Sequence, residues 1–177
     1  MRWDHAAALA ELTLGNDLTR WFPQPLDERV HVEQFVADAL DLAAKQLALP
    51  FAIVTRDGRI AGSTRFGAVV AEHRRVEIGW TFVGRDFQRT PVNTAAKLLL
   101  MEHGFERLGC NRIELKTDSR NTVSRAAIAR LGAAEEGILR HHILCADGHL
   151  RDTVYFSVLA HEWPAVKAGL QAKLAAR

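Results

Sequence analysis

The sequence lacks several features that would assign a function directly. It has only two cysteines, Cys110 and Cys145, at a spacing typical of neither a metal site nor a disulfide framework. No apolar run approaches the roughly 20 residues of a membrane helix, and the N-terminus has no basic-then-apolar signal pattern. The formal net charge is only +2, with scattered arginines, which disfavours nucleic-acid binding. We therefore expect a cytoplasmic protein with no metal, no membrane partner and no nucleic-acid partner.

The composition that remains is that of an ordinary globular protein. The chain has 177 residues, of which 48% are hydrophobic and 25% are charged. This length is enough for one domain with a substantial core. No repeat, linker or low-complexity segment divides the sequence, so we expect residues 1–177 to form a single domain.

Helix and strand patterns follow one another along the chain. Apolar spacing and turn residues predict helices over 4–14, 28–47, 94–108, 121–131 and 160–177. They predict two strands around the Asp57-Gly58 turn, then strands over 75–83, 112–117, 136–145 and 151–159. The strand–helix–strand unit in the middle makes its two strands parallel, because such crossovers are right-handed. The expected fold class is α/β (α+β), with a mixed, mostly antiparallel twisted sheet flanked by helices.

Alternation in the strand 75–83 divides its side chains between two faces. We expect one face to carry Val76, Ile78, Trp80 and Phe82, and the other to carry Glu77, Gly79, Thr81 and Val83.

The loop after this strand reads GRDFQRTPVNT and leads into a helix. A helix N-terminus exposes unpaired N–H groups and the positive end of a dipole, and phosphate binds there readily. Arg85 and Arg89 add positive charge. The alternative is a plain connecting loop with two surface arginines.

Three pieces, in order, resemble the GNAT superfamily of N-acyltransferases, and more narrowly its RimJ/RimL-type ribosomal-protein alanine acetyltransferases. They read VEIGWTFV, then FQRTPVNTAAKLLLMEHGFERLGCNRIELKTDSRNTVSRAAIARLGA, then EEGILRHHILCADGHLRDTVYFSVL. The similarity covers about residues 25 to 160. It implies the GNAT fold, acetyl-CoA as cosubstrate and an amine acceptor. The implied cofactor contacts are Phe82, Val83, Gln88, Arg89, Thr90, Val92, Asn93, Thr94, Asn121 and Ser124.

Pro91 departs from the pyrophosphate motif of the superfamily, which has glycine at this place. Proline has no N–H, so one phosphate donor is lost, although its φ suits a helix start. One interpretation is a phosphate cradle in which the side chains of Thr90, Asn93 and Thr94 compensate. The other is a cradle that no longer binds CoA.

The resemblance also implies two catalytic groups. Several superfamily members use a glutamate on the strand equivalent to 75–83 as the base, and Glu77 is the candidate here. The alternative for Glu77 is a surface carboxylate paired with Arg75 or another cation. The tyrosine that many members use as acid is absent from the helix after residues 112–117, because Tyr155 is the only tyrosine.

RimL-like relatives place a serine near the sulfur in the pattern N-x-x-S, which Asn121 and Ser124 match. Asn121 would then bind the pantetheine amide, and the backbone near 81–83 would polarise the thioester. The alternatives are a helix cap for Asn121 and a surface hydroxyl for Ser124.

The reaction that these expectations support is acetyl transfer from acetyl-CoA to a primary amine, either a protein N-terminus or a small molecule. The alternative is an inactive acyl-CoA-binding regulatory domain. A homodimer is possible. The sequence opens at a helix, so the first strand of the family is expected to be missing.

Overall fold

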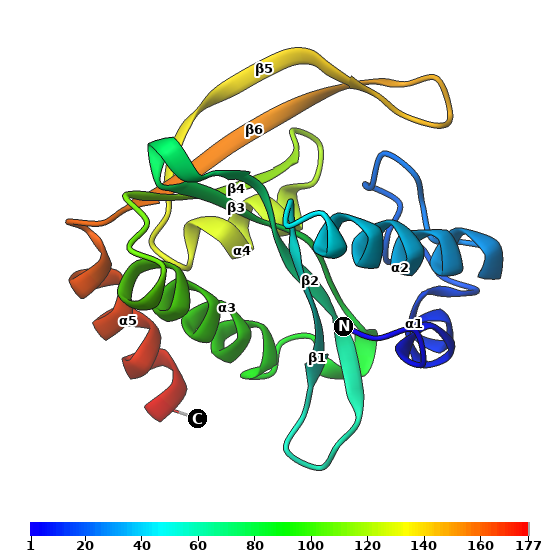
Figure 1. The fold of residues 1–177 in the computed structure, drawn as a ribbon, viewed down its shortest axis with the longest axis horizontal. Helices are drawn as coiled ribbons and strands as arrows, with labels where there is room; N and C mark the ends of the chain where they lie inside the picture. The colour runs from blue at the N-terminus through cyan, green and yellow to red at the C-terminus, as the bar shows by residue number, and fades with distance from the viewer. Residues whose placement is uncertain (177) are drawn as a thin grey trace.

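A six-stranded sheet forms the centre of the computed structural model, which describes residues 1–176 (Figure 1). Its strands are β1 (Leu49–Val54), β2 (Ile60–Val70), β3 (Arg75–Val83), β4 (Arg112–Asp118), β5 (Ala134–Leu144) and β6 (Leu150–Leu159). The strand order is β1-β2-β3-β4-β6-β5. The pair β3–β4 is parallel and the other four pairs are antiparallel, which confirms the expected fold class.

Helices cover both faces of the sheet (Figure 1). Helices α1 (His5–Thr13) and α2 (Arg29–Ala44) pack on one face, called here the α2 face. Helices α3 (Val92–Glu102), α4 (Thr122–Ala129) and α5 (Trp163–Ala175) pack on the other, called here the α3 face. Each face therefore has its own hydrophobic cluster, and the sheet separates the two.

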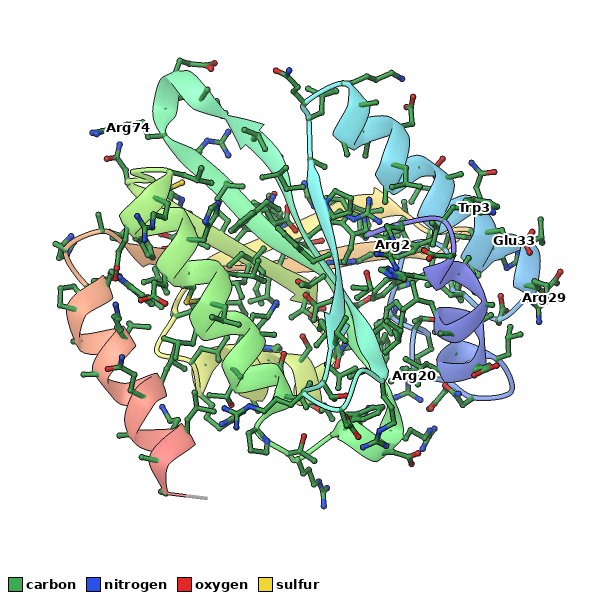
Figure 2. All side chains as sticks on the ribbon, turned by 60° about the horizontal axis from the view of Figure 1, so that its bottom comes forward. Arg2, Trp3, Arg20, Arg29, Glu33 and Arg74 are labelled. Atoms are coloured by element: carbon green, nitrogen blue, oxygen red, sulfur yellow. The ribbon has the colours of Figure 1, made fainter. Side chains whose placement is uncertain are left out.

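Helix α2 shows how the sequence pattern sets the packing. Val32, Phe35 and Val36 recur at helical spacing and are buried against the sheet. Arg29 and Glu33 lie on the outward side of the helix (Figure 2). The amphipathic pattern thus fixes which side of α2 faces the sheet.

Helix α3 is shorter than the expected helix 94–108. It begins at Val92 and ends at Glu102, and a single π-helical turn, His103–Arg107, continues it. Gly104 in this turn lies so close to β4 that an added Cβ would stand 2.7 Å from Ile113 Cδ1. The π turn brings the backbone against the core, which apolar periodicity alone does not reveal.

A β-bulge interrupts β3 at Trp80. Gly79 lies opposite Arg65 and Phe82 opposite Ser63, so three steps on β3 match two on β2, and Trp80 has φ +50°. The extra residue shifts the alternation by one place. Trp80 therefore contacts Gly67 and Arg65 on the α2 face.

The expected division of β3 into two faces is therefore wrong beyond Gly79. Phe82 belongs to the hydrophobic cluster on the α2 face, whereas Val76 and Ile78 belong to the cluster on the α3 face. Thr81 bonds to Lys97 of α3, so it lies on the α3 face rather than beside Glu77.

The described residues begin with a helix, and β1 is an edge strand of the sheet. The N-terminal amine of Met1 donates a hydrogen bond to the Pro50 carbonyl of β1 at 2.7 Å. The N-terminus is thus held against the edge strand of the sheet.

Gly62 allows β2 to approach β3 beyond the bulge. Its φ is +158°, and an added Cβ would stand 2.1 Å from the Phe82 carbonyl oxygen. We expect Gly62→Ala to lower the free energy of unfolding by about 2–3 kcal/mol, measured by urea denaturation.

Gly137 provides a matched control for this prediction. It has a similar φ of +154°, but an added Cβ would meet nothing within 4 Å. Gly137→Ala should therefore cost much less, and equal losses in the two variants would contradict the role of the close approach.

Candidate functional site

The parallel pair β3–β4 opens part of the way along its length. The strands pair at Arg75–Arg112, Val76–Ile113 and Glu77–Glu114, and no further. Strand β3 continues to Val83, while β4 stays paired with β6 over its whole length. The sheet therefore has a gap in strand pairing between β3 and β4, called here the opening, where the β4-side backbone groups of β3 beyond Glu77 pair with no strand within residues 1–176.

The loop from β3 to α3 lies beyond this opening. Thr90 Oγ1 donates to the Phe87 carbonyl at 2.6 Å and accepts from the Val92 N–H at 3.3 Å. The Asn93 and Thr94 N–H groups, in the first turn of α3, pair with no backbone acceptor in the described part of the chain. The loop can thus offer donors to an anion even though Pro91 has none.

The side chains of this loop are partly engaged already. Gln88 Nε2 donates to the Val83 carbonyl at 3.0 Å, which returns its side chain to the end of β3. Arg85 pairs with Asp17 at 2.5 Å. Arg89 is exposed, with a left-handed φ of +58°. Its backbone has the conformation that glycine adopts most readily, and its side chain remains at the surface of the loop.

Arg130, at the C-terminal end of α4, is a cation beside this loop, and the sequence analysis did not identify it. Its Nη2 donates to Thr94 Oγ1 at 3.4 Å, so it connects α4 to the first turn of α3. Lys173 of α5 donates to the Arg130 carbonyl at 2.9 Å and fixes that helix end. The sequence shows only that an arginine lies shortly before Gly132. The contact of Arg130 with Thr94 arises because the C-terminal end of α4 lies near the first turn of α3.

The start of α4 borders the same face. Asn121 Oδ1 accepts from the Ser124 N–H at 3.0 Å, so Asn121 is an N-cap. Its side-chain amide N–H groups remain for other partners. Ser124 is half-buried. The structure therefore confirms the cap for Asn121, which is compatible with a ligand contact.

Glu77 is the last residue of β3 that pairs with β4. Its side chain is 12% exposed and forms an ion pair with Lys116 Nζ at 2.9 Å. Lys116 also approaches Glu114 at 3.4 Å. Burial lowers the pKa of Lys116, but the charge and hydrogen bond of Glu77, together with the charges of Tyr155 and Glu114, outweigh burial and raise the pKa overall. The partner of Glu77 is thus Lys116 rather than Arg75.

The sole tyrosine lies beside this pair. Lys116 Nζ is 4.5 Å from the centre of the Tyr155 ring, and the Tyr155 hydroxyl lies 3.4 Å from His142 Nε2. These side chains form a polar row across the α2 face. The sequence analysis left Tyr155 out of the site because it comes late in the chain. Antiparallel pairing of β4 with β6 places Tyr155 directly opposite Lys116.

Lys97 of α3 is a second cation that the sequence reading missed. It is buried, and its Nζ donates to Thr81 Oγ1 at 2.7 Å and approaches Thr64 Oγ1 at 3.5 Å. Burial lowers the pKa of Lys97 to about 7, and the negative charge of Glu77 only partly opposes this. Lys97 therefore supports the bulge from the α3 face through two threonine hydroxyls.

The described residues contain neither a membrane-spanning helix nor a group of metal-ligating side chains. None of the helices within residues 1–176 has the length and apolar character needed to cross a bilayer. Across the same residues, no three His, Cys, Asp or Glu side chains are grouped so that they could hold a metal ion.

Comparison with known proteins gives this arrangement a context. A family model described as "Acetyltransferase (GNAT) domain" matches residues 1–134. The "Putative ribosomal N-acetyltransferase YdaF" of Bacillus subtilis (strain 168) is 33% identical to this chain over 171 residues, covering 92% of this chain and 90% of YdaF.

Solved structures agree with the family model. A GCN5-related N-acetyltransferase from Brucella melitensis superposes with a TM-score of 0.84 at 33% identity, covering 97% of this chain and 78% of that chain. Mycobacterium smegmatis RimJ, in complex with CoA-disulfide, superposes with a TM-score of 0.82 at 27% identity, covering 98% of this chain and 86% of RimJ.

The lowered pKa of Lys97 predicts a pH-dependent stability. The unfolded chain has an ordinary lysine pKa of 10.5, so it binds more protons than the folded chain between about pH 7 and 10.5. The buried charge thus destabilises the fold below pH 7, and this cost disappears as the pH rises towards 10.5. Relative to Lys97→Met, the free energy of unfolding of the wild type should rise by up to ~1.4 kcal/mol per pH unit in this window.

Urea denaturation at several pH values tests this expectation. Lys45→Met, at an exposed lysine at the end of α2, is the control and should differ from the wild type by a nearly constant amount. A constant difference for Lys97→Met as well would contradict the lowered pKa.

Proposed function

This chain belongs to the GNAT acetyltransferase family, in its RimJ/RimL-like branch, and we propose that it moves the acetyl group of acetyl-CoA to a primary amine by direct attack. The observation that carries the proposal is the end of β3–β4 pairing at Glu77–Glu114, beside a helix N-terminus with free N–H groups. Where the two strands are unpaired, a thioester held from the α3 face would meet an amine held on the α2 face.

The residues of the α3 face fit acetyl-CoA. The loop residues Gln88, Arg89, Thr90, Val92, Asn93 and Thr94 would hold the pyrophosphate through backbone N–H groups, and Arg130 would add positive charge. The backbone of Phe82 and Val83 would receive the pantetheine arm along the unpaired edge of β3. Asn121 would bind a pantetheine amide through its free side-chain N–H groups.

Glu77 and Ser124 would handle the protons of the reaction. The amine nitrogen forms a bond to the thioester carbon, and the carbon–sulfur bond breaks. Glu77 would accept the amine proton, directly or through water. Ser124 would donate a hydrogen bond to the sulfur as negative charge develops, before the thiolate takes a proton from solvent.

The acceptor in this proposal is a primary amine. Support for a protein N-terminus comes from the names of the relatives, since YdaF is described as a ribosomal N-acetyltransferase. A test of the function is the release of free CoA thiol from acetyl-CoA with a panel of peptides and small amines. Tight acetyl-CoA binding without release, whatever the amine, would select a regulatory acyl-CoA-binding domain instead.

The phosphate cradle yields a binding prediction. Asn93 stands in the first turn of α3, beside the free N–H groups. We expect Asn93→Leu to weaken acetyl-CoA binding at least tenfold, or ~1.4 kcal/mol, because the bulky apolar side chain obstructs the phosphate. Isothermal calorimetry measures the change. Asn111→Leu, at an exposed asparagine just before β4, should bind as the wild type does, and unchanged affinity in Asn93→Leu would argue against the cradle.

The proposed base yields a kinetic prediction. Glu77→Gln keeps the shape of the side chain but cannot accept a proton, so kcat should fall roughly 100-fold while acetyl-CoA affinity holds. Glu72→Gln, in the exposed turn before β3, serves as the charge control. A rate close to that of the wild type in Glu77→Gln would remove Glu77 from the mechanism.

A further inference from the structure

Arg65, in the middle of β2, is a buried cation to which the proposed chemistry gives no role. It is 2% exposed and lies on the α2 face, opposite Gly79. Its guanidinium carbon is 4.6 Å from the centre of the Phe35 ring and 4.8 Å from the Trp80 ring. The guanidinium is therefore held between two aromatic side chains, one from α2 and one from the bulge.

No carboxylate neutralises this guanidinium. Its Nε is buried without a hydrogen-bond partner, and within residues 1–176 no acidic group forms an ion pair with it. The nearest negative influence is the charge of Asp38, which acts on Arg65 without bonding to it. The neighbouring cations on this face differ, because Arg75, Arg112 and Lys116 all pair with Glu114.

A buried cation without a counter-ion has a desolvation cost that no ion pair offsets. Burial lowers the pKa of Arg65 to about 10, so its charge costs stability. A methionine or leucine would fill the same space between Phe35 and Trp80 at lower cost. Ser63 Oγ, two residues earlier on the same strand face, is also buried without a partner. The unused donors point to a ligand that supplies the missing acceptor oxygens.

Arg65 lies close to Glu77, at the end of the β3–β4 pairing, so a ligand of Arg65 would lie beside the opening. Gly79, its cross-strand partner, also lies next to Glu77, since an added Cβ there would stand 2.6 Å from Glu77 Oε1. Arg65 and Glu77 are thus diagonal neighbours on one sheet face, roughly 7–8 Å apart at the backbone. Trp80 is 38% exposed, so one of the two rings that contact Arg65 borders solvent.

We propose that Arg65 binds a carboxylate of the acceptor, so that the substrate is an amine that carries a carboxylate group. This inference rests on the proposed acetyl transfer. With its faces against Phe35 and Trp80, the planar guanidinium would meet a planar carboxylate along its edge, which suits bidentate pairing. The carboxylate comes either from a free amino acid or from an acidic side chain at a peptide N-terminus.

Matched acceptor pairs test this assignment. The first pair is an α-amino acid and its amide, and the second is a peptide amide beginning with glutamate and the same peptide beginning with glutamine. The wild type should prefer the carboxylate member of one pair by at least ~10-fold in kcat/KM, and that pair identifies the source. Equal use of both members in both pairs would overturn the proposal, as would a preference for O-phosphoethanolamine over every carboxylate.

Variants assign the preference to the side chain. Arg65→Met should abolish the preference while acetyl-CoA affinity, measured by calorimetry, is retained, and Arg65→Lys should keep part of it. Arg56→Met, at an exposed arginine in the β1–β2 turn, is the matched control and should behave as the wild type. A full preference in folded Arg65→Met would exclude Arg65 as the anion site.

A measurement without turnover separates this proposal from the proposed function. Thermal melting is followed with an N-acetylated amino acid and, separately, with its amide. The acid should stabilise the wild type more than the amide does, and this difference should vanish in Arg65→Met. If acetyl transfer fails with every amine but this difference is found, the anion site stands and the transfer reaction falls. Because Arg65→Met removes an unpaired buried charge, its melting temperature without ligand should equal or exceed that of the wild type.

Discussion

The bulge at Trp80 is the constraint on which the rest of the site depends. One extra residue on β3 turns its end away from regular pairing, just beyond the last β3–β4 pair at Glu77. A regular β3 paired with β4 to its end would close the sheet and separate the two faces. The bulge therefore lies within the segment of β3 that β4 does not pair. It also places Trp80 on the α2 face and Thr81 on the α3 face.

Two buried cations hold the bulge from opposite faces. Lys97 bonds to Thr81 from the α3 face, and Arg65 stacks on Trp80 from the α2 face. Each has a pKa lowered by burial, and neither has a carboxylate at bonding distance within the described residues. Buried charges of this kind cost folding energy. Their position on both sides of one strained strand segment fits the general observation that proteins store such costs at functional sites.

Local patterns in the sequence determine most of the fold and little of the site. Turn residues such as Asp57-Gly58 and the spacing of Val32, Phe35 and Val36 suffice to predict the strands, the amphipathic helix and the parallel crossover. The period-two pattern of β3 fails at Trp80, because a bulge adds a residue without changing the sequence pattern. The sequence analysis also did not identify Arg130 and Lys97 as site residues, because the partner of each comes from a distant element of the chain. The loop before α3 was predicted as a phosphate site from its place at a helix N-terminus, whereas Glu77 and Asn121 came from resemblance. The roles of all three stay predictions.

The charges on the α2 face also bear on how an amine becomes reactive. Attack requires the neutral amine, and a neighbouring cation lowers the pKa of an amine. A carboxylate on the same substrate has the opposite effect, because its negative charge stabilises the ammonium form. On the proposed assignment, Arg65 pairs with that carboxylate and cancels its effect on the pKa of the amine. Lys116 forms an ion pair with Glu77 on the same face. One guanidinium would then select the substrate and also favour loss of the proton that the reaction requires.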